Sequence, residues 1–278
     1  MWHHVIENFD TLIQNVNPTP IQTQDIITKV GSINSCLASR YYPNYQPNSS
    51  LMLCHVVGSH GKGTAIRPLS DVDVHFYLPQ DFVRRYMARS GNQPSQLLQD
   101  VKNSLTKTFP DTPMNADGQV VVLDFSTVKF EVVPVFLGAD NLVYYCDSND
   151  GGTFRACNPT FELNYINHYD QLYGGKVRHL SQFIKAWKLE NQVDLKGSAI
   201  DVAACSFLIQ WKYNQESIFW YDWMIRDFFE FLISKKNFFY TIPGTTEQLP
   251  LGDSWVFKAE RSYKTALTAC DYERNDWG

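Results

Sequence analysis

The chain has 278 residues, of which 44% are hydrophobic, and its net charge is −5. This size and composition suit one bilobed molecule with a sizeable core. The acidic balance argues against a protein that grips long nucleic-acid duplexes, because such proteins usually present a basic face. There is no run of about 18 apolar residues that could span a membrane, and the first residues lack the basic-then-apolar pattern of a secretory signal. We therefore expect a cytoplasmic protein.

Apolar periodicity along the chain predicts a sheet-rich first half and a helical second half. A helix at 21–40 is followed by a strand, a Gly-rich turn and a second strand within 51–78. Later helices are expected at 94–109, 164–190, 198–213, 216–236 and 256–270, with strands at 119–125, 128–137 and 141–146. We expect an α+β fold with lobes at 1–160 and 161–278, bridged by the N-terminal helix. Ligands usually bind in clefts, so the cleft between the lobes is the expected active site.

Two aspartates in the second of the early strands are the strongest chemical signal. Asp71 and Asp73 are two residues apart, and alternate strand residues point to the same face. Their neighbours are apolar, so two unpaired carboxylates there would be costly. A divalent cation such as Mg²⁺, which prefers oxygen ligands and substrate phosphates, resolves the repulsion. The turn at Gly58 and Ser59 precedes this strand.

A two-metal site needs a third carboxylate, and there are two candidates. Glu131 interrupts the apolar run at 128–136 and is predicted to lie in mid-strand. Asp124 lies just before Ser-Thr, where its strand is expected to end, so a turn-capping role is favoured for it. We therefore choose Glu131. Pro134 suggests that this strand lies at a sheet edge or ends there.

These residues carry a resemblance to a known family. The succession of Gly-Ser, Gly-Thr, Asp-Val-Asp and a distant acid followed by two apolar residues and Pro resembles the DNA polymerase β-like nucleotidyltransferases. The chain is similar above all to the branch of bacterial cyclic-oligonucleotide synthases (CD-NTases), cyclic GMP–AMP synthase and oligoadenylate synthases. Residues 177–188 contain that branch's Lys-x-Trp, and residues 195–203 resemble the helix start that follows it. The likeness covers roughly residues 20–270.

The resemblance implies a two-Mg²⁺ nucleotidyl transfer, with Mn²⁺ as a possible substitute. Asp71 and Asp73 would bridge both ions, and Glu131 would hold the ion that activates the acceptor hydroxyl. Many relatives have Asp in place of Glu131, and Glu in place of Asp201, but both changes keep a carboxylate. Backbone amides at Gly58 and Ser59 could approach the phosphates closely.

Three further residues are candidate phosphate contacts. Lys185 is implied by the resemblance, with Ser198 on the next helix, and the less favoured reading of Lys185 is a solvated helix residue. Lys62, inside the Gly-rich turn, could reach phosphate or be a plain loop lysine. His75 shares a strand face with Asp73 and is either a supporting residue or an ordinary buried histidine. The dense aromatics from Phe207 to Phe231 are read as core packing, and one or two could stack on a base.

The favoured function is synthesis of a cyclic di- or trinucleotide messenger from nucleoside triphosphates. By resemblance, that messenger would act on a separate effector in antiphage signalling. The acidic charge argues against an obligatory double-stranded nucleic-acid activator. The absence of a Cys-x-x-Cys pair among the six cysteines argues against a zinc insertion. The alternatives are a linear oligoadenylate synthase, a nucleotidyltransferase acting on RNA or a small molecule, and a nucleotide-binding pseudoenzyme. A pseudoenzyme would be expected to have lost one of the three carboxylates.

Overall fold

The computed structural model describes residues 3–46 and 50–275 and divides the chain into two compact units, each with its own hydrophobic core. The sheet unit comprises Pro18–Gly61 and Leu69–Pro159, and the helical unit comprises Met1–Asn17, Lys62–Pro68 and Thr160–Gly278. The chain therefore passes between the units several times, in contrast to the two continuous segments expected from the sequence. Among the described residues, no helix combines the length and apolarity needed to cross a membrane.

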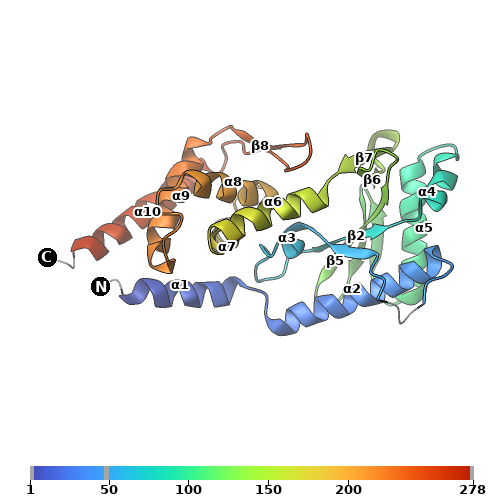
Figure 1. The fold of residues 1–278 in the computed structure, drawn as a ribbon, viewed down its shortest axis with the longest axis horizontal. Coiled ribbons are helices and arrows are strands. Elements are labelled where there is room, and N and C mark those ends of the chain that lie inside the picture. The colour runs from blue at the N-terminus through green and yellow to red at the C-terminus, as the bar shows by residue number, and fades with distance from the viewer. Residues whose placement is uncertain (1–2, 47–49, 276–278) are drawn as a thin grey trace. The chain divides into compact units, whose positions relative to one another are not determined.

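A mixed seven-stranded sheet forms the centre of the sheet unit. Its main strand order is β1-β2-β5-β4-β3, with β6 pairing to β5 and β7 to β6. Figure 1 labels β2, β5, β6 and β7 of this sheet. Strands β2 and β5 are parallel, and the other pairs are antiparallel. The bounds are β1 Cys54–Val56, β2 Val72–Tyr77, β3 Met114–Asp117, β4 Val120–Asp124, β5 Lys129–Leu137, β6 Val143–Asp147 and β7 Thr153–Cys157.

One face of this sheet is covered by helices. The apolar stripes of α2 (Pro20–Tyr41) and α5 (Gln93–Thr108) form one core with the buried residues of β2, β4 and β5. In β2, buried and half-buried residues alternate, so Val72, Val74 and Phe76 point into this core. Asp73 therefore points to the opposite face. The short helices α3 (Gly58–Gly61) and α4 (Gln80–Met87) complete the unit.

The expectation for Pro134 was wrong, because β5 is an interior strand and continues to Leu137. Pro134 pairs in register with Phe76 of β2 on one side. On the other side, pairing with β4 ends at Val132 and pairing with β6 begins at Val135. Pro134 thus lies where β5 changes partner. Proline has no N–H to donate, and at this position the ladder does not need that hydrogen bond.

The helical unit contains α1 and the elements from α6 onward. Their bounds are α1 His3–Val16, α6 Pro159–Leu172, α7 Lys176–Glu190, α8 Gly197–Gln210, α9 Tyr221–Ser234, α10 Val256–Asn275, β8 Phe239–Thr241 and β9 Gln248–Pro250. Most of the aromatics between Phe207 and Phe231 pack in or against its core, which confirms their predicted role.

The single long helix expected at 164–190 is instead two helices. Gly174 and Gly175 separate α6 from α7, with φ of 61° and 87°. Glycine adopts this left-handed conformation at little cost. The carboxylate of Asp170 accepts a hydrogen bond from the Arg178 amide in the first turn of α7, at 2.9 Å. The apolar periodicity continues across the break, which is why the sequence pattern did not reveal it.

Candidate active site

The turn between β1 and β2 lies directly against Asp73. Gly58 has φ of 58°, and a Cβ atom there would lie 1.9 Å from Asp73 Oδ2. The backbone of the turn is also joined to β2, since the Val57 amide donates to the Asp73 carbonyl at 2.9 Å. Only glycine permits both the backbone conformation and this close approach. The predicted Gly-Ser turn and the predicted carboxylate are thus adjacent.

Asp71, Asp73 and Glu131 lie on the sheet face opposite the core that β2 and β5 share with α2 and α5. Glu131 is in register with Asp73 across the parallel pair β2–β5. Asp71 lies one residue before β2 and two residues before Asp73, so by strand alternation it is on the same face as Asp73. The ammonium group of Lys129, two residues before Glu131, lies 2.7 Å from Asp71 Oδ2 and 3.8 Å from Glu131 Oε1. The sequence analysis did not single out Lys129, although it shares a strand face with Glu131.

Negative charge is concentrated at this point. Partial burial, together with the nearby carboxylates of Asp71 and Asp73, raises the pKa of Glu131 above its ordinary value, and Lys129 opposes the rise only in part. A hydrogen bond to Asp71 raises the pKa of Lys129. The charges of Asp71 and Asp73 therefore disfavour the ionised form of Glu131, and an additional cation would favour it.

Asp124, the competing third acid, occupies a different position. It is the last residue of β4 and lies opposite Lys129 of β5. Strand β5 separates β4 from β2, whereas Glu131 is the direct neighbour of Asp73. The register thus supports the choice of Glu131 over Asp124 as the third member of the cluster.

His75 lies two residues beyond Asp73 on the same strand face and is half-buried. Burial lowers its pKa to about 4, with a further contribution from His55. The imidazole is therefore neutral at neutral pH and does not offset the charge of the carboxylates. Its Nδ1 atom is buried without a hydrogen-bond partner among the described residues, so His75 is not the satisfied buried histidine of the alternative reading.

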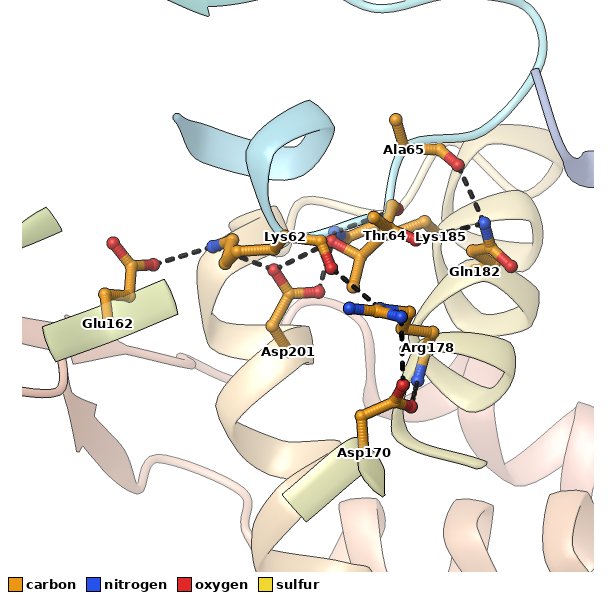
Figure 2. Close-up of polar contacts among 10 residues, drawn as sticks. Lys62, Thr64, Ala65, Glu162, Asp170, Arg178, Gln182, Lys185 and Asp201 are labelled. Atoms are coloured by element: carbon orange, nitrogen blue, oxygen red, sulfur yellow. Dashed lines mark hydrogen bonds and ion pairs between the residues drawn. The ribbon is translucent and has the colours of Figure 1, made fainter. Parts of the chain in front are cut away.

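The candidate phosphate lysines belong to a buried charge cluster in the helical unit (Figure 2). Lys62 is only 5% exposed, and its Nζ lies 2.6 Å from Glu162 Oε1 and 2.9 Å from Asp201 Oδ2. Lys185 is 8% exposed, and its Nζ lies 2.6 Å from Asp201 Oδ1. Lys62 is therefore not a plain loop lysine, and Lys185 is not a solvated helix residue.

Asp201 is the shared anion of this cluster and is 1% exposed. Burial alone would raise its pKa, but the ammonium groups of Lys185 and Lys62 outweigh that effect, so its pKa lies below the ordinary value. The pKa of Lys62 is raised, because Asp201 and Glu162 outweigh the opposing effect of burial. Ser198 lies in the first turn of α8, next to Gly197, whose Cβ position would be 3.4 Å from Lys185 Cε.

In the sequence, Asp201 stands out only as a departure from the family pattern. No sequence pattern points to a role for Thr64 or Glu162. One signal was available: Asp201 interrupts the apolar start of α8, and a carboxylate buried in such a helix must be paired. Its partners come from segments far away in the sequence, and sequence spacing could not identify them.

The three carboxylates fit divalent cations by their chemistry. Carboxylate oxygens are the ligands that Mg²⁺ and Mn²⁺ prefer. A cationic group, the ammonium of Lys129, already contacts Asp71. Within residues 3–46 and 50–275, no three His, Cys, Asp or Glu side chains already converge as a set of metal ligands. Binding a metal ion here therefore requires side-chain rotation around Asp71, Asp73 and Glu131.

Known proteins resemble the chain in both sequence and structure. Residues 4–169 match the family described as the Second Messenger Oligonucleotide or Dinucleotide Synthetase (SMODS) domain. The CCA-adding enzyme of Saccharolobus shibatae is 28% identical over 131 residues, which are 47% of this chain and 28% of that enzyme. The chain thus spans little more than a quarter of the length of the curated relatives that it matches.

Two solved structures are similar over most of both chains. The Escherichia coli MS115-1 CdnC:HORMA-deltaN complex matches with a TM-score of 0.62 at 19% identity, covering 97% of this chain and 89% of that chain. Vibrio cholerae DncV cyclic AMP-GMP synthase, in complex with the linear intermediate 5′ pppA(3′,5′)pG, has a TM-score of 0.71 at 14% identity, with coverages of 96% and 90%. These likenesses confirm the expected α+β fold class.

Proposed function

We propose that this chain, which belongs to the family of SMODS domains among the CD-NTases, joins nucleoside triphosphates into a cyclic di- or trinucleotide. The observation that carries the proposal is the group of Asp71, Asp73 and Glu131 on one face of the parallel strands β2 and β5. In each transfer, a ribose hydroxyl oxygen bonds to the α-phosphorus of a triphosphate, and the bond to the pyrophosphate oxygen breaks. The last transfer, within the linear intermediate, closes the ring, so a cyclic dinucleotide forms with release of two pyrophosphates and a cyclic trinucleotide with release of three.

We infer that these three carboxylates hold two divalent ions, Mg²⁺ or Mn²⁺. Members of the family depend on divalent metal ions. When bound, such ions stabilise the charge that develops on the attacking and leaving oxygens. The support in this chain is the crowding of carboxylates that raises the pKa of Glu131, together with the contact between Asp71 and the Lys129 ammonium. By the family resemblance, Asp71 and Asp73 would hold both ions.

Glu131 is assigned to the acceptor side of the reaction. By the family resemblance, it would hold the ion that activates the acceptor hydroxyl. It would receive the proton that the attacking ribose hydroxyl loses.

Gly58 and Ser59 are assigned to the triphosphate. The bare Cα of Gly58 beside Asp73 leaves room for phosphate oxygens to approach the backbone of the turn. Lys62, Lys185 and Ser198 remain proposed phosphate contacts. Of the two lysines, Lys62 is the better candidate, since its ammonium has three N–H donors and contacts two carboxylates.

We place this activity in the cytoplasm, where nucleoside triphosphates are available, and in antiphage signalling through a separate effector. This setting rests on the family resemblance alone. A plaque assay checks it. Cells that express the wild-type chain with its neighbouring genes should resist phage, and the same cells with Asp73→Asn should not. Equal plaque counts would contradict the assignment.

A product assay tests the chemistry. Purified protein is incubated with the four labelled triphosphates and Mg²⁺ or Mn²⁺, and the products are treated with phosphatase and resolved by mass. We expect a phosphatase-resistant product from the wild type and none from Asp73→Asn, which keeps the shape of the side chain. A product that phosphatase shortens would indicate a linear synthase. Nucleotide binding without turnover under all conditions would indicate a pseudoenzyme.

A further inference from the structure

One face of α7 holds the chain segment that follows the Gly-Ser turn. Arg178, Gln182 and Lys185 recur at the spacing of one helix face, and all three donate to main-chain carbonyls of residues 62–65 (Figure 2). Arg178 Nε donates to the Lys62 carbonyl at 3.1 Å, and Lys185 Nζ donates to the Thr64 carbonyl at 3.2 Å. Gln182 Nε2 lies 3.0 Å from the Ala65 carbonyl.

Asp201 of α8 holds the side chains of the same segment. Its Oδ2 atom accepts a hydrogen bond from the Thr64 hydroxyl at 3.2 Å and lies 2.9 Å from Lys62 Nζ. Its Oδ1 atom lies 2.6 Å from Lys185 Nζ, which also donates to the Thr64 hydroxyl at 2.7 Å. Thr64 is fully buried, so these contacts are shielded from water.

The oxygens around Lys185 account for its donors. An ammonium group has three N–H donors. Three protein oxygens lie within 3.2 Å of Lys185 Nζ: the carbonyl and the hydroxyl of Thr64, and Asp201 Oδ1. A phosphate oxygen could bind Lys185 only by replacing one of them. Lys185 thus joins Thr64 to Asp201, and binding a phosphate would require it to give up one of these contacts.

We propose that Asp201 is a positioning residue, which fixes residues 62–65 on α7 and α8 through Lys62, Thr64 and Lys185. Because Lys62 is covalently joined to Gly61, anchoring this segment restricts the C-terminal end of the Gly58–Gly61 turn that we assign to the triphosphate. The importance of that restriction for catalysis rests on the proposed function. The positioning itself does not.

Matched variants at Thr64 test the proposal with little risk to folding. Thr64→Val removes the hydroxyl that joins Lys185 to Asp201 but keeps the direct ion pair, and Thr64→Ser keeps the hydroxyl. In hydrogen exchange, the peptide covering residues 58–68 should exchange about tenfold faster in Thr64→Val than in the wild type or Thr64→Ser. In the product assay, kcat should fall about tenfold to a hundredfold in Thr64→Val, with KM for the triphosphate changed less than about threefold.

Asp201→Asn provides the second test, with Asp194→Asn, the same change at an exposed position before α8, as its control. If Asp201 positions the segment, residues 58–68 should exchange faster and kcat should be lower in Asp201→Asn but not in Asp194→Asn. Asp201→Glu should restore part of the exchange protection and part of kcat. A lower KM with unchanged kcat and unchanged exchange would mean that Asp201 competes with phosphate for the lysines, which overturns the proposal. If Asp201→Asn does not fold, the Thr64 pair decides.

The hydrogen-exchange measurement needs no substrate, so it tests the positioning role of Asp201 independently of the proposed function. A wild-type protein without nucleotide products would overturn the proposed function, and the exchange rates would still decide whether the cluster positions the segment. Equal exchange of residues 58–68 in Thr64→Val and Thr64→Ser would overturn the positioning role even in an active enzyme.

Discussion

The contact between Gly58 and Asp73 makes this glycine the most restrictive single position in the site. Gly58→Ala would place a Cβ atom 1.9 Å from Asp73 Oδ2 and would also hold alanine at φ of 58°. We expect destabilisation by about 1–2 kcal/mol from the backbone conformation. Displacement of the carboxylate should lower kcat about a hundredfold or more. Thermal melts and initial rates check both effects.

Gly31→Ala is the matched control for that substitution. Gly31 lies in α2, and its Cβ position has nothing within 4 Å. Alanine there should leave activity unchanged and stabilise the protein by about 0.5–1 kcal/mol, because glycine is a poor residue inside a helix. Equal activity of Gly58→Ala and Gly31→Ala would contradict the role of the turn.

Lys129 places a positive charge among the three carboxylates that we propose as metal ligands. Its ammonium lies 2.7 Å from Asp71 Oδ2, so it would compete with a divalent ion for that oxygen and repel the ion. We expect Lys129→Met to tighten Mn²⁺ binding to the nucleotide-free protein about threefold to tenfold, the gain being limited because Lys129 is partly exposed. Electron paramagnetic resonance of free Mn²⁺ measures the dissociation constant.

Lys107→Met, at an exposed position of α5, makes the same charge change away from the carboxylates and should leave the constant unchanged. Weaker Mn²⁺ binding in Lys129→Met would show that Lys129 helps to form the site and does not compete with the metal ion.

At the scale of elements, the break between α6 and α7 is held by one buried carboxylate. Asp170 is 4% exposed, accepts a hydrogen bond from the Arg178 amide at 2.9 Å and lies 3.3 Å from Arg178 Nη1. Asp170→Ala should destabilise the helical unit by about 1–3 kcal/mol, because it leaves donors of α7 without this partner. Asp194→Ala, at an exposed position, should cost less than about 0.5 kcal/mol.

Tryptophan fluorescence during urea unfolding is suited to this comparison. None of the seven tryptophans lies within the sequence of the sheet unit, so the signal reports on the helical unit. A midpoint for Asp170→Ala equal to that of Asp194→Ala would refute the capping role.

The sequence predicted those elements whose pattern is local. The helix expected at 21–40 is α2, Pro20–Tyr41, and the strand expected at 128–137 is β5, Lys129–Leu137. It did not predict β7, because none of its residues is buried and it lacks an apolar pattern, so its pairing with β6 defines it. It also did not predict the break before α7, which depends on the backbone angles at Gly174 and Gly175. Strand alternation was enough to bring Asp71 and Asp73 together, whereas the pairing of β2 with β5 was needed to add Glu131.

At the scale of the whole molecule, the net charge bears on whether a nucleic-acid duplex can bind and activate the protein. The net charge of −5 gives the chain no excess of basic residues with which to bind a duplex. We expect double-stranded DNA or RNA to change the initial rate of product formation by less than about twofold at physiological salt. Stimulation by more than about tenfold that disappears as salt is raised would refute this, since such loss is the mark of phosphate contacts.

The central claim is that Asp71, Asp73 and Glu131 act together on the metal ions of nucleotidyl transfer. The most direct measurement is pyrophosphate release, with saturating Mg²⁺ and triphosphates, by the wild type, Glu131→Gln and Asp124→Asn. These two variants remove one carboxylate charge each from neighbouring strands, and only Glu131 is in register with Asp73. The account predicts a loss of about a thousandfold or more for Glu131→Gln and a rate within about threefold of wild type for Asp124→Asn. The reverse order would contradict the account.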